Sequence, residues 1–230
     1  IKYASNSFLA CKIAFINEMA DLSEQLGANI DDLSYTIGLD RRIGGSFLKA
    51  GPGFGGSCFP KDIMALKYLA QTVGSKSLIL NAVIEANNNR PTTMLTKIRK
   101  IIGKLEKTHI ALLGLIYKSG TDDYRSSPAM IIYQLLKSEG AHIKAFDPMV
   151  NNKIKEDFPG LSLEESVEKA CVNSQAVIIL TEWDSFRSID WYQLKKLMSN
   201  NIIIDLRSYL DFEIIRKAGF RYYSIGRKNE

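Results

Sequence analysis

The sequence predicts an α/β protein in two parts, an all-helical domain at residues 1–105 followed by a parallel-sheet domain at residues 106–230. Apolar residues recur at three- and four-residue spacing through the first hundred residues, which is typical of helices that bury one face. Beyond residue 107, short apolar runs alternate with helical patterns, which is typical of a parallel sheet covered by helices. With 46% apolar and 24% charged residues, the composition excludes a disordered chain.

The helical domain begins with a predicted helix over residues 3–27, which Gly27 ends as a C-cap. Asp31 and Asp32 are predicted to cap a short second helix that runs to Ile37. Helical periodicity is then lost from residue 41 to 61, where six glycines indicate a shaped loop. Further helices are predicted at residues 62–70 and 77–102, with Pro91 either kinking the last helix or splitting it in two.

The second domain is predicted to alternate strands with helices and to be Rossmann-like. Strands that alternate with helices form a parallel sheet, whose ligands bind beyond the carboxyl ends of the strands. The predicted strands lie at residues 109–115, 143–146, 176–180, 202–205 and 222–225, and the predicted helices lie at residues 127–139, 164–170, 191–198 and 212–218.

Charge and cysteine usage narrow the class of protein. Thirty Lys and Arg against 25 Asp and Glu leave a net charge of +5, which suits an anionic small ligand. The basic residues are scattered and no nucleic-acid-binding motif is present, so no nucleic-acid partner is expected. No apolar run approaches the roughly 20 residues of a membrane-spanning helix, so no membrane partner is expected either. His109 and His142 lack partners at metal-ligand spacing, and no metal site is predicted.

Three widely spaced cysteines form neither a disulfide framework nor a zinc ligand set, which favours a reducing, cytoplasmic location. The chain opens on Ile-Lys-Tyr-Ala, without an initiator Met or a leader peptide, and is interpreted as a piece of a longer protein.

The glycine-rich segment over residues 51–62 holds the strongest chemical signal. Gly51, Gly53 and Gly56 satisfy the G-x-G-x-x-G pattern, but no strand precedes them, so a dinucleotide-binding turn is not predicted. The segment leads into Cys58, with Lys61 and Asp62 close behind, at the start of a predicted helix. Such surroundings favour a thiolate nucleophile, although a cysteine can also pack as a small apolar residue, and both interpretations stay open. Cys11 and Cys171 are expected to be structural.

Two further segments carry polar residues where a ligand could bind. Lys2 and Asn6 fall on the apolar stripe of the first helix, which indicates either a lined pocket or an exposed helix end. Lys118 and Arg125 follow the first predicted strand and could meet phosphate oxygens, unless they belong to a solvated loop. Ser127 is predicted to cap the next helix, with Pro128 at its first position. A weaker candidate for ligand contact is the acidic segment over residues 182–184, after a later strand.

These motifs together resemble the UDP-glucose/GDP-mannose dehydrogenase family. The resemblance rests on Lys2-x-x-x-Asn6, on Gly-Pro-Gly-Phe-Gly-Gly-Ser-Cys-Phe-Pro-Lys-Asp at residues 51–62, and on residues 118–128, in the same order and spacing over nearly the whole chain. The cysteine loop is most similar to the branch of the family that acts on UDP-glucose. The resemblance implies a helical central domain, an NAD cofactor, a homodimer, and a four-electron oxidation of UDP-glucose to UDP-glucuronate through a cysteine thiohemiacetal and thioester.

The resemblance also implies roles for single residues. Cys58 would be the nucleophile, Lys2 and Asn6 would stabilise the oxyanion, and Asp62 would position the hydrolytic water. The residues that would bind the substrate are Lys2, Phe47, Leu48, Lys49, Ala50, Gly51, Gly55 and Lys118. Arg42 would bind the substrate of a neighbouring subunit. Lys61 and Arg125 would contact the cofactor.

The chain departs from the family in one respect, since the amino-terminal Rossmann domain with its G-x-G-x-x-G turn is absent. We therefore expect that these 230 residues alone do not turn over. Two alternatives remain, a noncatalytic module that binds a nucleotide sugar and dimerises, and a cysteine acyl-transfer enzyme unrelated to NAD.

Overall fold

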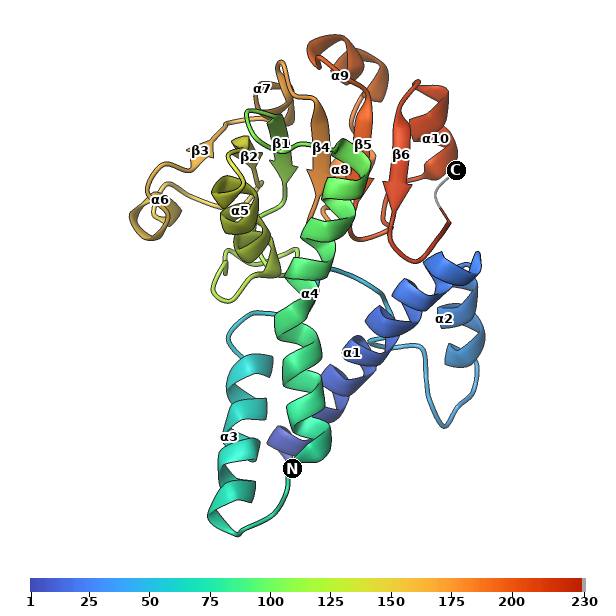
Figure 1. Ribbon diagram of the computed structural model, residues 1–230, viewed down its shortest axis with the longest axis vertical. Coiled ribbons are helices and arrows are strands. Elements are labelled where there is room, and N and C mark those ends of the chain that lie inside the picture. The colour runs from blue at the N-terminus through green and yellow to red at the C-terminus, as the bar shows by residue number, and fades with distance from the viewer. Residues whose placement is uncertain (229–230) are drawn as a thin grey trace.

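The computed structural model describes residues 1–228, which form a helical half and a sheet half joined by one long helix (Figure 1). The helical half contains α1 (Lys2–Leu26), α2 (Ile30–Gly38), α3 (Phe59–Thr72) and α4 (Leu78–Ile102). In the described part of the chain, no helix is both long and apolar enough to cross a bilayer.

Local chemistry explains where these helices begin and end. Gly27 closes α1 in the left-handed conformation, with φ of 74°, as predicted. The cap of α2 was predicted wrongly, because Asn29 holds that position and its side chain accepts the N–H of Asp31 at 3.0 Å. Asp31 and Asp32 lie inside the first turn instead. Helix α3 also begins three residues earlier than predicted, at Phe59, since proline is favoured in a first helical turn.

The sequence left open whether Pro91 kinks the last helix of the helical half or splits it in two, and α4 answers this question. It continues through this proline as one helix of 25 residues, so the chain is not split there. The helix packs against both α1 and α5 (Pro128–Ser138), and Pro91 itself is buried. These contacts offset the loss of one backbone hydrogen bond, because tertiary packing supplies most helical stability in proteins.

The sheet half contains six parallel strands in the order β3-β2-β1-β4-β5-β6. The predicted parallel sheet is therefore confirmed. The strand β3 was missed, because two residues without an apolar run carry no periodic signal. The strands are β1 (His109–Leu113), β2 (His142–Phe146), β3 (Ser162–Leu163), β4 (Ala176–Ile179), β5 (Ile202–Asp205) and β6 (Arg221–Ser224).

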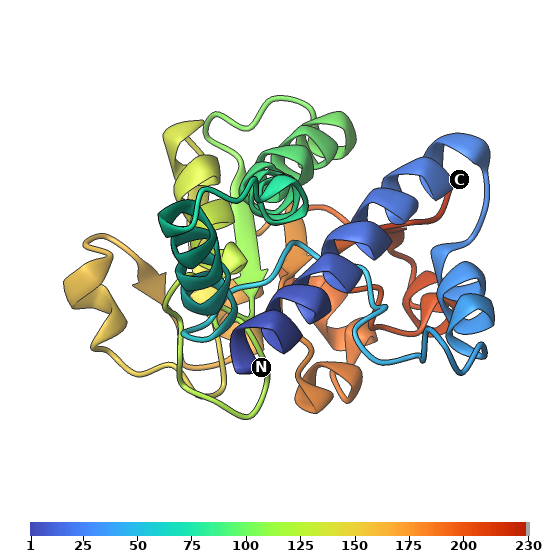
Figure 2. The ribbon, with the colours of Figure 1, turned by 90° about the horizontal axis from the view of Figure 1, so that it is seen from below.

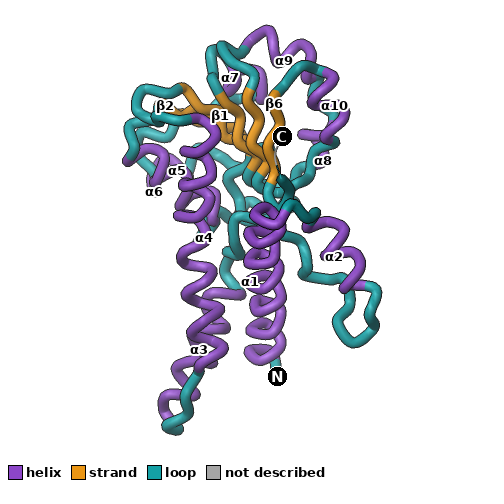
Figure 3. The backbone as a smooth tube through the Cα atoms, turned by 45° about the vertical axis from the view of Figure 1, so that its right-hand side comes forward, coloured by secondary structure: helices purple, strands orange, loops and turns teal. Residues whose placement is uncertain are grey.

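Helices cover both faces of this sheet, as Figure 3 shows. Ile110 and Leu112 of β1 enter a core shared with α1, α4 and α5, whereas Ala111 and Leu113 enter a second core on the opposite face. This alternation is the two-residue period of a strand. The second core packs against α7 (Val167–Cys171), α8 (Asp184–Arg187), α9 (Trp191–Leu197) and α10 (Phe212–Lys217), while α6 (Ile154–Asp157) lies near the β3 edge.

The two halves share one continuous core. Ile16 and Ala20 of α1 belong to the same buried cluster as Leu112 and Ile178 of the sheet. The segment after β6 also returns to the corner between α1 and α2 (Figure 2). The N–H of Ile30 donates there to the carbonyl of Gly226 at 2.8 Å. The boundary at residue 105 or 106 stays a prediction, and α4 ends just before it.

The cysteine in the second core makes the stability of the fold sensitive to alkaline pH. Burial, with a smaller effect of Glu168, raises the pKa of the Cys171 thiol from 9.0 to about 12. The folded state therefore holds this proton more tightly than the unfolded chain, so the stabilisation is complete below pH 9 and is lost as the pH rises towards 12. We expect the free energy of unfolding to lose about 2 kcal/mol between pH 8 and pH 10.5 from this group.

Urea unfolding of the wild type and of Cys171→Ala at both pH values measures this loss. The stability difference between the two proteins should narrow by about 2 kcal/mol at the higher pH. An equal difference at both pH values would contradict the assignment.

Candidate active site

The amino end of α3 presents the candidate nucleophile. Cys58 is the residue that precedes the helix, and it is exposed, whereas Cys11 is half-buried and Cys171 is buried. The N–H of Asp62 donates to the Cys58 carbonyl at 2.9 Å, which places Asp62 one helical turn behind the thiol. Free N–H groups and the helix dipole at such an end stabilise a developing thiolate.

Asp62 brings together three predicted residues, of which Lys2 and Asn6 are distant from it in the sequence and Lys61 is its neighbour. Its carboxylate is fully buried and accepts a hydrogen bond from Asn6 Nδ2 at 2.7 Å. Lys2 Nζ lies 3.6 Å from Asp62 Oδ2, and Lys61 Nζ lies 3.8 Å from Asp62 Oδ1. The packing of α1 against α3 creates this cluster. The sequence left open whether Lys2 and Asn6 line a pocket or lie at an exposed helix end. Lys2 is exposed over 65% of its side chain, whereas Asn6 is partly buried.

One atom of this cluster is left without a hydrogen-bond partner. Asp62 Oδ1 is buried and accepts no hydrogen bond from the described residues, because the Lys61 ammonium at 3.8 Å is too far away to donate one. An unsatisfied buried carboxylate oxygen is costly unless a water or ligand meets it. The arrangement therefore suits an acceptor for a water molecule beside the cysteine.

A cavity of about 250 Å³ lies between the glycine-rich loop and the carboxyl ends of the strands. Phe59, which follows Cys58, is one of its walls, so the cavity reaches the residue next to the thiol. Five predicted substrate residues line it, namely Phe47, Lys49, Gly51, Gly55 and Lys118. The segment over residues 182–184, a weaker candidate, contributes Glu182 to the lining. The remaining lining residues were not predicted, namely Ile13, Gly53, Phe54, Phe59, Tyr117 and Arg207.

Arg207 is the most important residue that the sequence analysis missed. Its Nε donates to the Leu180 carbonyl at 2.9 Å and its Nη2 donates to the Tyr117 carbonyl at 3.4 Å. Burial lowers the pKa of this guanidinium, although the carboxylates of Glu182 and Asp205 act in the opposite direction. Arg207 lies two residues beyond β5, so the rule that ligands bind at the carboxyl ends of strands would have found it.

Lys49 also lines the cavity. Its ammonium pairs with Glu182 at 3.0 Å and lies 5.0 Å above the ring of Tyr209. The lining therefore contains three cations, Lys49, Lys118 and Arg207, against one carboxylate, Glu182. Such an excess of positive charge favours an anionic ligand.

Two buried carboxylates fix the loops that carry these cavity residues. Asp147, just after β2, accepts the N–H groups of Leu115 and Ile116 at 2.7 and 3.3 Å and the indole of Trp183 at 3.3 Å. These bonds end β1 two residues earlier than predicted. Asp205 has the same role at the end of β5, where it accepts the N–H groups of Arg207, Tyr209 and Leu210 and the hydroxyl of Tyr222. Burial raises the pKa of Asp205.

The glycines of the loop are required by close approaches to other backbone and side-chain atoms. A Cβ at Gly55 would lie 2.1 Å from the Ser126 carbonyl oxygen, and one at Gly56 would lie 2.6 Å from the Tyr117 ring. The N–H of Gly56 donates to the Arg125 carbonyl at 3.2 Å. The glycine-rich loop and the segment after β1 therefore form one wall. Ser127 caps α5 with Pro128 in its first turn, as predicted.

Four of the predicted residues belong neither to the cavity nor to the cluster of Lys2, Asn6, Cys58 and Lys61 around Asp62. Leu48 and Ala50 are buried in the core behind the loop, so their side chains are packing residues in this conformation. Arg42 is 88% exposed and pairs with Asp40. Arg125 is exposed too and pairs with Asp123 at 2.8 Å.

The two histidines lie together at the end of the sheet opposite to the cavity. The rings of His109 and His142 stack on each other, with centroids 4.9 Å apart, at the amino ends of β1 and β2. Among the described residues, no cluster of three metal-ligating side chains is present.

Residues 1–89 match the central domain of the UDP-glucose/GDP-mannose dehydrogenase family, and residues 111–212 match the UDP binding domain of that family. The chain belongs to the UDP-glucose/GDP-mannose dehydrogenase family. UDP-glucose 6-dehydrogenase of Rickettsia conorii is 51% identical over 231 residues, covering 99% of the chain and 54% of that protein. The enzyme of the same name from Rhizobium meliloti is 43% identical, with 99% of the chain and 52% of that protein covered. The chain thus spans about half the length of the curated relatives it matches.

Solved structures agree with the fold. A UDP-glucose dehydrogenase from Pyrobaculum islandicum superposes with a TM-score of 0.85 at 33% identity, covering 96% of this chain and 49% of that one. A UDP-D-ManNAc dehydrogenase from Pyrococcus horikoshii has a TM-score of 0.82 at 28% identity, covering 99% of this chain and 51% of that one. The predicted α/β architecture with a Rossmann-like second half is therefore confirmed.

Proposed function

We propose that this chain supplies the catalytic cysteine and the sugar-nucleotide site of an NAD-dependent UDP-glucose 6-dehydrogenase. One observation carries the proposal: exposed Cys58 lies one helical turn from buried Asp62, beside a cavity with an excess of cations. The relatives at about 51% identity support UDP-glucose as the substrate. The product would be UDP-glucuronate, formed by a four-electron oxidation.

The cations of the cavity would hold the diphosphate. Lys118 and Arg207 come from two strand ends that converge on it, and Arg207 is already oriented by its bonds to Leu180 and Tyr117. A guanidinium fixed in this way loses little side-chain entropy when it meets a phosphate. Because Phe59 lines the cavity and follows Cys58, the sugar end of a ligand bound there would extend towards Cys58.

NAD⁺, when bound, accepts one hydride in each of the two oxidation steps. In this chain, the exposed cations of Lys61 and Arg125 fit an anionic cofactor on the rim of the cysteine helix. A dinucleotide-binding domain joined to this chain would hold the nicotinamide.

The residues around Cys58 suit the steps in which sugar carbon 6 is bonded to sulfur. After the alcohol has been oxidised to an aldehyde, the Cys58 thiolate adds to the aldehyde carbon. The aldehyde oxygen then becomes an oxyanion. Lys2 is exposed and Asn6 keeps one amide N–H beyond its bond to Asp62, so both can stabilise that oxyanion. Hydride loss from this adduct leaves a thioester.

Hydrolysis of the thioester would use Asp62. Its unpartnered Oδ1 accepts a hydrogen bond from water, which attacks the thioester carbon. The carbon–sulfur bond breaks, one proton of the water passes to the sulfur, which leaves as the Cys58 thiol, and the other passes by way of Asp62 to solvent as the carboxylate product leaves. Water supplies the added oxygen, and the two hydride transfers account for four electrons.

Isothermal titration calorimetry of the chain with UDP-glucose tests the site. We expect one ligand per chain, and a Kd that rises at least about tenfold for Arg207→Gln, because a charge-assisted phosphate contact is lost. Lys137→Gln is a suitable control, since this lysine is exposed and bonds to the Pro159 carbonyl away from the cavity. No binding by the wild type, or equal binding by Arg207→Gln, would contradict the assignment.

We also propose a homodimer that forms through the helical half. Phe8, Phe15 and Leu22 of α1 are exposed over 66%, 50% and 42% of their surface at seven-residue spacing, which is an apolar stripe that no part of residues 1–228 covers. The exposed Arg42 would then reach the site of the second copy.

Sedimentation velocity checks the dimer. We expect the wild type to be dimeric and Phe15→Asp to be monomeric, because the substitution places a charge in the apolar stripe. Tyr192→Asp provides the control, since Tyr192 is 58% exposed on α9 of the sheet half. A monomeric wild type, or a Phe15→Asp variant that stays dimeric, would contradict this interface.

The three free cysteines support a reducing compartment, and we propose that the protein acts in the cytoplasm.

A further inference from the structure

Two buried side chains hold both backbone polar groups of Gly51. The N–H of Gly51 donates to Asn17 Oδ1 at 2.8 Å, and Arg90 Nε donates to the Gly51 carbonyl at 3.0 Å. Asn17 and Arg90 are only 5% and 4% exposed. The peptide groups on either side of Gly51 are therefore fixed by the protein itself, whether or not the cavity is occupied.

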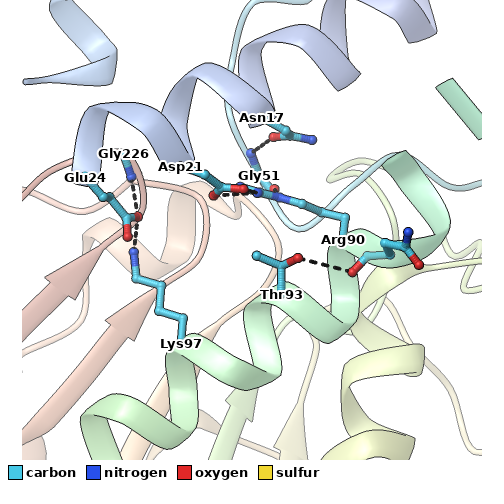
Figure 4. Close-up of polar contacts among 9 residues, drawn as sticks. Asn17, Asp21, Glu24, Gly51, Arg90, Thr93, Lys97 and Gly226 are labelled. Carbon is cyan, nitrogen blue, oxygen red and sulfur yellow. Dashed lines mark hydrogen bonds and ion pairs between the residues drawn. The ribbon is translucent and has the colours of Figure 1, made fainter. Parts of the chain in front are cut away.

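Arg90 is itself held in place by a carboxylate on the facing helix. Its Nη1 donates to both oxygens of Asp21 at 2.6 Å. Figure 4 shows Asn17, Asp21 and Glu24 of α1 facing α4, with Gly51 between the two helices. A lysine at position 90 could keep the charge, but it could not serve Asp21 and Gly51 at once with the geometry of the guanidinium.

Gly51 connects the α1–α4 helix pair to the cavity, because residues of both helices bind its backbone. It lines the cavity, and a Cβ there would lie only 2.9 Å from Arg207 Nη1. Helix α4 holds the same loop at a second point, since the Asn87 side chain accepts the N–H of Phe54 at 2.8 Å and donates to its carbonyl at 3.1 Å. A shift of Gly51 would therefore change the wall that faces Arg207.

We propose that Arg90 is a positioning residue for the sugar-nucleotide site, which fixes Gly51 and thereby sets the shape of the cavity before a ligand binds. The proposal rests on the proposed function, because it takes UDP-glucose as the occupant of the cavity. Arg90 touches neither the cavity nor Cys58 in the structure and acts through the Gly51 carbonyl.

A second ion pair between α1 and α4 provides a matched control, because it stabilises the helix pair without holding Gly51. Glu24 and Lys97 form an ion pair one or two turns further along the helices. Lys97 also donates to the Ser224 carbonyl at 2.6 Å, and Glu24 accepts the N–H of Gly226 at 2.7 Å. This pair joins α1 and α4 as the Arg90–Asp21 pair does, yet it makes no contact with Gly51.

Two measurements on the chain test the proposal, amide hydrogen exchange of Gly51 without ligand and calorimetric titration with UDP-glucose. For Arg90→Lys we expect Gly51 exchange to accelerate at least about tenfold, while the amide of Leu112 in β1 is unchanged. We also expect the Kd for UDP-glucose to rise about tenfold. Glu24→Gln should change neither quantity by more than about twofold, even if its thermal midpoint falls.

The proposal is overturned if Gly51 exchange in Arg90→Lys stays at the wild-type rate, or if Glu24→Gln weakens binding as much as Arg90→Lys. If Arg90→Lys does not fold, Asn17→Ala removes the other anchor of Gly51 and carries the same expectations. If the wild type does not bind UDP-glucose, the proposed function fails, while the exchange measurement still decides whether Arg90 fixes Gly51.

Discussion

Replacing Cys58 with serine is expected to lower kcat roughly a thousandfold, about 4 kcal/mol of transition-state stabilisation. The measurement is NADH formation from UDP-glucose by an enzyme in which this chain is joined to a dinucleotide-binding domain. A serine hydroxyl is a much weaker nucleophile at neutral pH than a cysteine at the amino end of a helix, where Cys58 lies. The covalent adduct therefore forms slowly, and the second oxidation fails with it.

Substrate affinity should survive the same change. The cavity is lined by Phe59 and not by Cys58, so we expect the Kd for UDP-glucose to stay within about twofold. Cys11→Ser is the matched control, because Cys11 lies within α1 among apolar residues, and we expect its kcat to stay near the wild-type value. A Cys58→Ser enzyme that still produces UDP-glucuronate at the wild-type rate would exclude the sulfur as nucleophile.

Replacing Gly55 with alanine is expected to distort the wall between the glycine-rich loop and the segment after β1. The added Cβ would lie 2.1 Å from the Ser126 carbonyl oxygen and 2.9 Å from Pro128 Cδ. Because these are backbone and ring atoms that cannot rotate away, the loop must move. We expect the free energy of unfolding to fall by about 1–3 kcal/mol and the Kd for UDP-glucose to rise more than about tenfold.

Gly45→Ala separates this steric effect from a general cost of alanine in the loop. A Cβ at Gly45 would meet its nearest atom, the Gly38 carbonyl oxygen, at 4.0 Å. Urea unfolding and calorimetry should therefore give wild-type values for Gly45→Ala. Wild-type stability and binding in Gly55→Ala would show that the close approach at Ser126 is not maintained in solution.

Most of the fold could be predicted because its long elements carry clear periodic signals. The four long helices and the five longer strands are near their predicted positions. The missed elements, β3, α6 and α8, have two to four residues, which is too short for a period to appear. The capping error at α2 has a different cause, since Asn29, Asp31 and Asp32 are all good caps and only the backbone decides among them.

The candidate site was partly predictable for a related reason. Cys58 and Asp62 are close in the sequence, and Lys2 and Asn6 were placed on one helix face, but only the packing of α1 on α3 brings the two pairs together. Arg207 was missed because it stands alone after β5, without a motif. The anchors of Gly51 are a product of helix packing alone, so no local pattern could have indicated Asn17 or Arg90.

Mass spectrometry of a trapped intermediate tests most directly the claim that Cys58 becomes bonded to the sugar. The enzyme that joins this chain to a dinucleotide-binding domain would carry Asp62→Asn, which slows thioester hydrolysis, and would be quenched after incubation with UDP-glucose and NAD⁺. The account predicts that the peptide containing Cys58 gains the mass of a UDP-glucuronyl group, and that Cys58→Ser abolishes this gain. An adduct on another residue, or product formed without any adduct on Cys58, would contradict it.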